Sequence, residues 1–165
     1  MPNTPPVPID AEHAAFMQGA VSMTMGSCSR DNVPSIVRAY GCRLTDKRDR
    51  VTLALWQAQA EPILADIRST GKVAIVFSLP ENHQTMQLKG ADATIGDADD
   101  ELRARVERYR DAFVRQLVRL GYEEALMRAF MTCPPDEIVT VSFTPAAAFT
   151  QTPGPNAGEP LKVRA

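Results

Sequence analysis

Pro34-Ser-Ile-Val-Arg-Ala-Tyr-Gly-Cys-Arg-Leu44 is the stretch around which the rest of the chain is organised. A turn signal at Asp31-Asn32 precedes it, and its β-branched residues and tyrosine predict a β-strand. Because side chains alternate between the two faces of a strand, Ile36, Arg38 and Tyr40 share one face. We expect that face to be buried, so that Arg38 needs an anionic partner or ligand. The alternative is a strand that ends in solvent with Arg38 as an ordinary surface residue.

The composition is that of one soluble globular domain: 165 residues, 44% apolar and 23% charged. A net charge of -2 and an aromatic content of 6% argue against a nucleic-acid-binding surface. The three cysteines, Cys28, Cys42 and Cys133, lack metal-ligand spacing and favour free thiols in a reducing cytoplasm. No secretion signal and no apolar segment of membrane-spanning length is recognisable. We therefore expect a cytoplasmic protein without a bound metal, nucleic acid or membrane partner.

Hydrophobic periodicity divides the chain into one central domain and two ends that are rich in proline. Residues 1–9 are predicted to form a flexible N-terminal arm, 10–149 a single domain, and 150–165 an extended C-terminal tail. Helices are predicted at 11–18, 61–69, from Asp97 or Asp99 to about 120, and at 123–130, and strands at 20–29, 34–44, 51–56, 73–77, 84–95 and 137–143.

The strand at 73–77, Val-Ala-Ile-Val-Phe, is apolar on both of its faces. This pattern predicts a strand that is buried on both sides. The predicted strands are mostly connected as hairpins, and the helices fall between or after them. The sequence therefore predicts a mainly β fold, a six-stranded antiparallel barrel with peripheral helices.

The order of these elements resembles the FMN-binding split-barrel family typified by pyridoxamine 5'-phosphate oxidase. The resemblance runs from about residue 10 to residue 143, and order and spacing carry it. Three short motifs contribute: Arg38-Ala-Tyr-Gly-Cys-Arg43; Leu53-Ala-Leu-Trp-Gln57 with the helix 63–69 and the strand 72–77 after it; and Thr85-Met-Gln-Leu-Lys-Gly90.

The resemblance implies a homodimeric flavoprotein with FMN in a groove at the subunit interface, acting as an oxidoreductase on a small molecule. Arg38 or Arg43 would bind the FMN phosphate, a role that suits the guanidinium group. The further contacts that the resemblance implies are main-chain groups of Ala39, Tyr40 and Gly41, residues Leu55 and Trp56, and the side chain of Gln87 or Thr85.

Two positions keep an alternative function open, a non-catalytic flavin- or haem-binding protein of the same fold. Family members open the helix after the third strand with residues that bind phosphate, whereas this chain has Gln59-Ala-Glu-Pro62. Glu61 would repel a phosphate there. His83 lies in a predicted loop near the groove, where it is either solvated, part of the flavin pocket or a haem ligand.

Six arginines crowd the long predicted helix: Arg103, Arg105, Arg108, Arg110, Arg115 and Arg119. Acidic residues are interspersed, with Glu101 four positions before Arg105. This spacing favours a solvated and partly ion-paired helix face. The alternative is that one of these arginines binds an anionic substrate or a phosphate.

Overall fold

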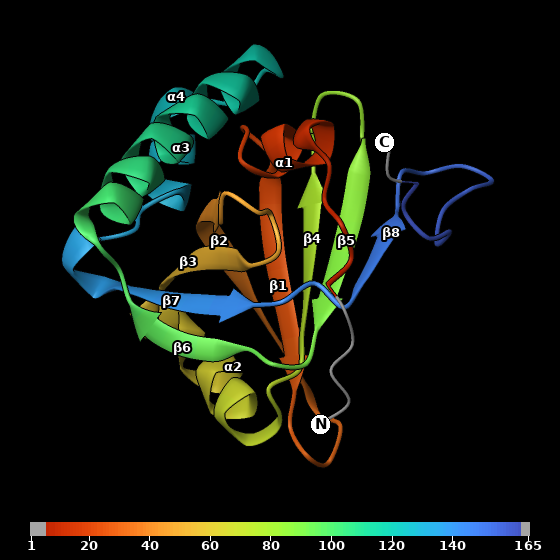
Figure 1. Cartoon of the computed structure of the whole chain (residues 1–165). Coiled ribbons are helices and arrows are strands. Elements are labelled where there is room, and N and C mark those ends of the chain that lie inside the picture. The colour runs from red at the N-terminus through yellow and green to blue at the C-terminus, as the bar shows by residue number, and fades with distance from the viewer. Residues whose placement is uncertain (1–5, 163–165) are drawn as a thin grey trace.

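A computed structural model describes residues 6–162 of the chain (Figure 1). Residues 1–5 of the predicted arm and 163–165 of the predicted tail lie outside the described residues. The elements, in chain order, are α1 (Ala11–Met17), β1 (Ser22–Cys28), β2 (Pro34–Leu44), β3 (Val51–Trp56), α2 (Gln57–Thr70), β4 (Val73–Ser78), β5 (Thr85–Gly90), β6 (Thr94–Asp97), α3 (Asp100–Arg119), α4 (Glu124–Phe130), the short 3-10 helix η1 (Pro135–Glu137), β7 (Ile138–Phe143) and β8 (Ala147–Thr150).

The strands form one eight-stranded sheet in the order β6-β7-β3-β2-β1-β4-β5-β8, with every pairing antiparallel. The long strand β2 pairs with both β1 and β3, and its register with β3 shifts between Ala39 and Cys42. Such a bulge bends a sheet. The half that contains β3, β6 and β7 crosses the half that contains β1, β4 and β5 (Figure 1). The predicted mainly β split-barrel class is confirmed, with eight strands instead of six.

Of the two additional strands, β6 arises where a predicted strand is divided, and β8 comes from a segment without a clear strand pattern. The predicted strand 84–95 breaks after Gly90, where an added Cβ would lie 2.5 Å from Cδ2 of Phe143, so the position favours glycine. After the break, β6 pairs with β7 at the far edge of the sheet. The second strand, β8, begins with alanines and pairs with β5. Alanine is depleted in strands, so this segment gave no strand signal.

Both described ends of the chain contact the domain. The Val7 N–H donates to the Pro145 carbonyl at 2.8 Å, and Ile9 is buried. The C-terminal residues fold back on β8, where the Leu161 N–H donates to the Ala148 carbonyl at 2.9 Å. Among residues 6–162, no helix has the length and apolar character that are needed to cross a bilayer.

Helix α2 packs against β1, β2, β3 and β6 and contributes its apolar side to the core. Its buried residues Ile63, Leu64 and Ile67 recur at helical spacing. The helix begins at Gln57, directly after β3 and earlier than the predicted start at 61, so Pro62 lies inside the helix instead of near its start. Its C-cap is Gly71, with a left-handed φ of 66° that favours glycine.

The structure reverses the predicted orientation of β2 before its bulge, whereas Tyr40, at the bulge, is buried as predicted. Val37 and Ala39 face the core, whereas Ile36 is 75% exposed. Arg38 therefore lies on the outward face of the sheet and not among core residues, although parts of its side chain are covered. The reversal has a simple cause: both faces of this strand carry β-branched residues, so alternation alone does not decide which face is buried.

The prediction that β4 is buried on both faces is wrong for the single chain. Val73, Ile75 and Phe77 are buried in the core, but Ala74, Val76 and Ser78 are partly exposed. Helix α2 packs on other strands and α3 packs on β2, so neither covers this side of β4. The outward side of β4 is thus an open surface with the apolar character of a buried one.

Candidate functional site

The outward side of four neighbouring strands brings predicted cofactor residues together. Arg38 is opposite Thr24, Thr24 is opposite Val76, and Val76 is opposite Gln87. Directly opposed residues in antiparallel strands point to the same face, so these side chains form one row across the sheet. We call this surface the open sheet face; it consists of Ser22, Thr24 and Gly26 of β1, Arg38 of β2, Ala74, Val76 and Ser78 of β4, and Thr85 and Gln87 of β5.

Arg38 is the partly buried cation of this face. Its Cζ lies 4.6 Å from the centroid of the Phe130 ring of α4, a cation–π contact. Its Nη1 is buried and has no hydrogen-bond partner within the described part of the chain. An unsatisfied buried donor costs about 1–3 kcal/mol, more when it is charged. An acceptor oxygen from a ligand would remove that cost.

Two tyrosines surround the Arg38 guanidinium and remain protonated. Burial raises the pKa of the Tyr40 hydroxyl, and the Arg38 charge acts in the opposite direction. Burial also raises the pKa of Tyr109, whose hydroxyl donates to the Val21 carbonyl at 2.7 Å. The Tyr40 hydroxyl donates to Gln59 Oε1 at 3.2 Å, which links β2 to the start of α2. Arg38 thus lies beside neutral aromatic groups.

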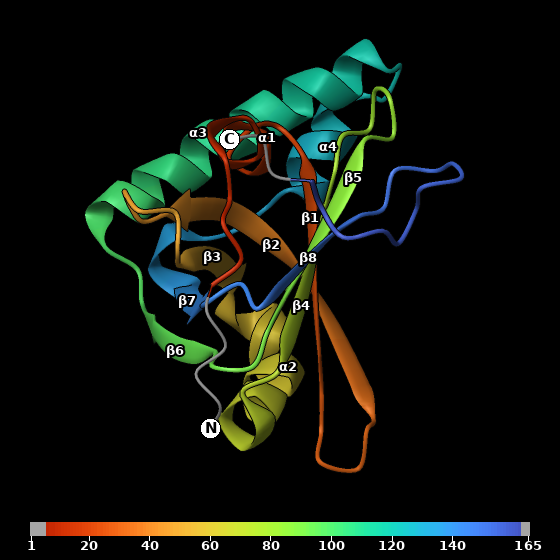
Figure 2. The same ribbon diagram turned by 45° about the vertical axis from the view of Figure 1, so that its right-hand side comes forward.

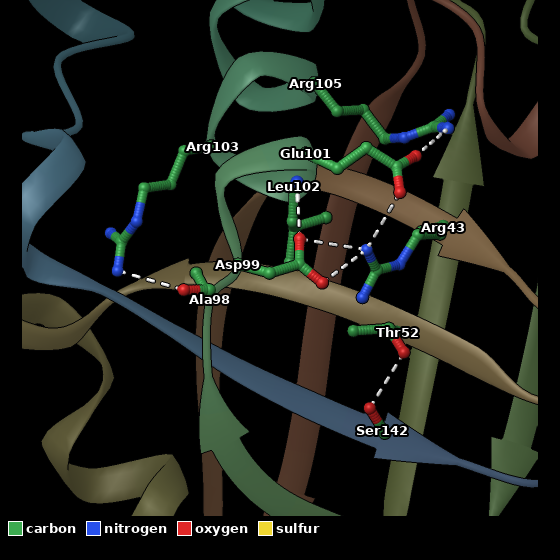
Figure 3. A network of polar contacts seen from close by, with 9 residues as sticks. All are labelled: Arg43, Thr52, Ala98, Asp99, Glu101, Leu102, Arg103, Arg105 and Ser142. Carbon is green, nitrogen blue, oxygen red and sulfur yellow. Dashed lines mark hydrogen bonds and ion pairs between the residues drawn. The ribbon is translucent and has the colours of Figure 1, made fainter.

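Arg43, the other predicted phosphate ligand, is ion-paired within the chain. Its Nη1 lies 2.8 Å from Oδ2 of Asp99 and 3.5 Å from Oε2 of Glu101 (Figure 3). Asp99 also accepts the Leu102 N–H at 2.7 Å as the N-cap of α3. That hydrogen bond, and then the one from Arg43, lower the pKa of the Asp99 carboxyl. Arg43 therefore connects β2 to the start of α3, and its charge is compensated there.

The remaining predicted contacts on β2 and β3 have side chains that serve the fold. Ala39 is opposite Leu55, and both are fully buried. Gly41 lies under α3, where an added Cβ would be 3.3 Å from Cγ2 of Val106. The Trp56 indole donates to Oε2 of Glu137 at 2.6 Å. These residues lie away from the row that contains Arg38 and Gln87.

The β4–β5 turn places His83 at the end of the open sheet face. His83 is exposed and has a left-handed φ of 61°. The Thr85 hydroxyl lies 2.8 Å from the Ser78 hydroxyl and also reaches the His83 carbonyl at 2.9 Å. The polar edge of the face is therefore held by hydrogen bonds across β4 and β5. Thr24 and Ser78 also belong to the open sheet face, and Phe130 contacts Arg38 there, although the sequence patterns did not single out these three residues.

Two clefts lie elsewhere on the chain, with volumes of about 430 and 210 Å³. They are lined mainly by α3 and by the segment between α1 and β1, and none of the predicted cofactor residues lines either of them. Neither of these two clefts is lined by residues of the open sheet face. A planar cofactor on this face would need a second wall.

No protein-family model and no curated protein sequence matches this chain. Several solved structures, however, are similar to it. HupZ of Group A Streptococcus is 17% identical, with a TM-score of 0.54 over 91% of this chain and 100% of that one. A Lactobacillus delbrueckii protein predicted to be a pyridoxamine 5'-phosphate oxidase is 11% identical, with a TM-score of 0.52 over 90% and 97%. An F420 reductase is 12% identical, with a TM-score of 0.51 over 85% and 98%.

These matches cover nearly all of the chain and nearly all of each neighbour. The chain therefore has the split-barrel fold of the pyridoxamine 5'-phosphate oxidase-like proteins, as the sequence resemblance implied. At these identities the likeness establishes the fold alone, and function must be argued from the site.

The three cysteines of the chain are free and differ in burial. Burial raises the pKa of the Cys42 and Cys133 thiols to about 12, whereas Cys28 is only partly buried. The thiolate is the nucleophile, so both raised thiols stay protonated and unreactive at mildly alkaline pH. We expect iodoacetamide to modify Cys28 in the native protein and all three cysteines after denaturation, as read by peptide mass spectrometry. Equal native labelling of Cys28 and Cys42 would contradict this.

Proposed function

We propose that this protein binds FMN on the open sheet face, at the interface of a homodimer, and acts as an oxidoreductase on a small molecule. The observation that carries the proposal is the buried Arg38 Nη1, a cationic donor without a partner among the described residues. It belongs to a sheet face whose central β4 residues are apolar and partly exposed, with Phe130 of α4 over Arg38 itself. Such a face favours a partner surface and an anionic ligand together.

The character of β4 supports the proposed homodimer. Its outward residues Ala74 and Val76 are apolar and partly exposed. Small side chains leave a flat surface on which a second sheet can pack closely. A second copy of the chain would bury this surface and supply the missing wall of a cofactor groove. A groove of this kind between two subunits is where the family resemblance places FMN.

The residues of the face fit the polar parts of FMN. Arg38 would hold the phosphate, because the charge of Arg43 is already compensated by Asp99 and Glu101. The Phe130 ring lies over the Arg38 guanidinium in a cation–π contact and helps to hold it in place. Gln87 and Thr85 would hydrogen-bond the polar edge of the ring. The flavin supplies the redox chemistry, and the chain's own residues bind, orient and shield it.

Haem is the second candidate ligand, and His83 is the observation that favours it. The imidazole is exposed on a turn at the end of the open sheet face. Neutral imidazole is a common metal ligand. In this case the protein would be a non-catalytic binding or carrier protein of the same fold.

The absorption spectrum of the freshly purified protein, followed by titration with FMN and with haemin, separates these functions. Flavin bands, or saturable binding of added FMN, support the proposal. A Soret band that is lost in His83→Ala supports the haem alternative. A colourless protein that binds neither compound would contradict both.

A further inference from the structure

We infer that the groove between α3 and the α1–β1 segment is a second ligand site, which binds a small molecule with two or more anionic groups. The inference rests on residues outside the open sheet face and does not depend on flavin binding. Figure 2 shows α1 beneath α3 and the β4–β5 turn beside the C-terminal end of α3. The groove lies between these elements.

Two adjacent clefts make up this groove. The larger, of about 430 Å³, includes residues of the β4–β5 turn, and the smaller, of about 210 Å³, reaches Met23 and Cys42. Both are lined by Ala20 and Ala112, so they meet where two small side chains leave room. Small-molecule sites in proteins typically measure roughly 300–1,000 Å³. The two clefts together fall within that range.

Arginines line the groove along one side of α3. They recur at intervals of three, seven and four residues, which places them on one face of a helix. The four are Arg105 and Arg108 at the smaller cleft and Arg115 and Arg119 at the larger. Among the residues that line the two clefts, Glu81 is the acidic one. The groove is therefore strongly cationic on a chain whose net charge is -2.

The two arginines of α3 that lie outside the groove have partners, and three of the four inside it do not. Arg103 donates to the carbonyls of Ala98 and Pro135, and Arg110 pairs with Glu107. By contrast, the exposed side chains of Arg108, Arg115 and Arg119 make no ion pair or hydrogen bond within residues 6–162.

Arg105 adds a buried donor at the smaller cleft. Its two terminal nitrogens reach Gln18 Oε1 at 3.1 Å and Glu101 Oε1 at 3.4 Å. Its Nε is buried and has no partner among the described residues. A ligand oxygen that reached this nitrogen would satisfy it and would add a charge-assisted hydrogen bond.

The spacing of the arginines defines the chemistry of the ligand. Seven residues separate Arg108 from Arg115, which is about 10 Å along the helix axis at roughly 1.5 Å per residue. The groove thus has two cationic ends joined by a segment lined with alanine. A molecule with anionic groups at both ends matches this arrangement, and guanidinium groups bind phosphates and carboxylates alike.

Calorimetric titration of the full chain with tripolyphosphate and with adipate, at constant ionic strength, tests the site. We expect saturable binding of at least one of them; tripolyphosphate alone indicates a phosphate ligand, and adipate alone a dicarboxylate. The double variant Arg108→Gln/Arg115→Gln should bind roughly tenfold more weakly or worse. Its matched control is Arg68→Gln/Lys72→Gln, which removes the same charge from exposed positions around the end of α2. The inference would be overturned if neither tripolyphosphate nor adipate bound, or if both double variants lost the same affinity.

A pair of uncharged variants tests the groove itself. Ala112→Leu fills the junction of the two clefts without altering charge, whereas Ala104→Leu places the same side chain at an exposed position of α3. We expect loss of anion binding in the first and wild-type affinity in the second. Ala112→Leu that folds, by circular dichroism, and binds like the wild type would overturn the proposed site. The exposed arginine variants decide the question if Ala112→Leu does not fold.

Discussion

Arg38→Gln is expected to weaken FMN binding by roughly 10- to 100-fold, the range given by the loss of charge-assisted hydrogen bonds to a phosphate. The expectation follows from the buried, unsatisfied Nη1 of Arg38 and from the Phe130 ring that lies over its guanidinium. Glutamine keeps a donor and much of the volume but removes the charge. The protein should remain folded, since Arg38 lies on the outward face and removing it leaves no buried charge behind.

Titration of FMN fluorescence with each variant provides the measurement, and Arg43→Gln is the matched control. Arg43 lies on the same strand but is ion-paired with Asp99 and Glu101. Its substitution should leave FMN affinity nearly unchanged while it loosens the start of α3 and lowers the unfolding temperature. Wild-type affinity in Arg38→Gln would exclude Arg38 as the phosphate ligand. A larger loss in Arg43→Gln would reassign the role to that residue.

Thr24→Arg is expected to convert the proposed dimer to a monomer and to abolish FMN binding. Thr24 is at the centre of the open sheet face, between Arg38 and Val76 in the row across the strands. In a dimer, two new arginines would meet in the interface near Arg38. Burying an unpaired charge costs several kcal/mol, which is a large part of a dimer's stability. The isolated subunit keeps its core, because this side chain points outward.

Light scattering coupled to size-exclusion chromatography measures the mass of each variant. Ala65→Arg, which adds the same charge at an exposed position of α2, should remain dimeric and bind FMN. Circular dichroism checks that both variants are folded. A dimeric Thr24→Arg protein would place the subunit interface elsewhere on the molecule, and the open sheet face would then lose its proposed role.

Local signals explain what the sequence predicted well. The bounds of β2 agree with the predicted strand because a turn signal precedes it and its β-branched residues mark it. The start of α3 agrees because Asp99 is a good N-cap residue before an amphipathic run. Which face of the first half of β2 is buried was not predictable, because Ile36 and Val37 point to opposite faces and are equally suited to a core.

The features that the sequence could not predict are those that depend on distant residues. Arg43 looked like a phosphate ligand, but Asp99 compensates its charge from 56 positions along the chain. Phe130 covers Arg38 only because α4 returns to β2. The sequence of β4 is apolar on both faces, but only one face is buried in the single chain. We interpret the second apolar face as the one that the proposed dimer would bury.

Sedimentation velocity of the FMN-loaded protein, recorded at both the protein and the flavin absorption bands, tests the central claim most directly. For the wild-type protein we predict one boundary with the mass of a dimer, in which protein and flavin sediment together. For Thr24→Arg we predict a slower boundary with the mass of a monomer and without a flavin signal. Flavin that remains at the meniscus, or that sediments with a monomer, would contradict a flavin site formed by two copies of the open sheet face.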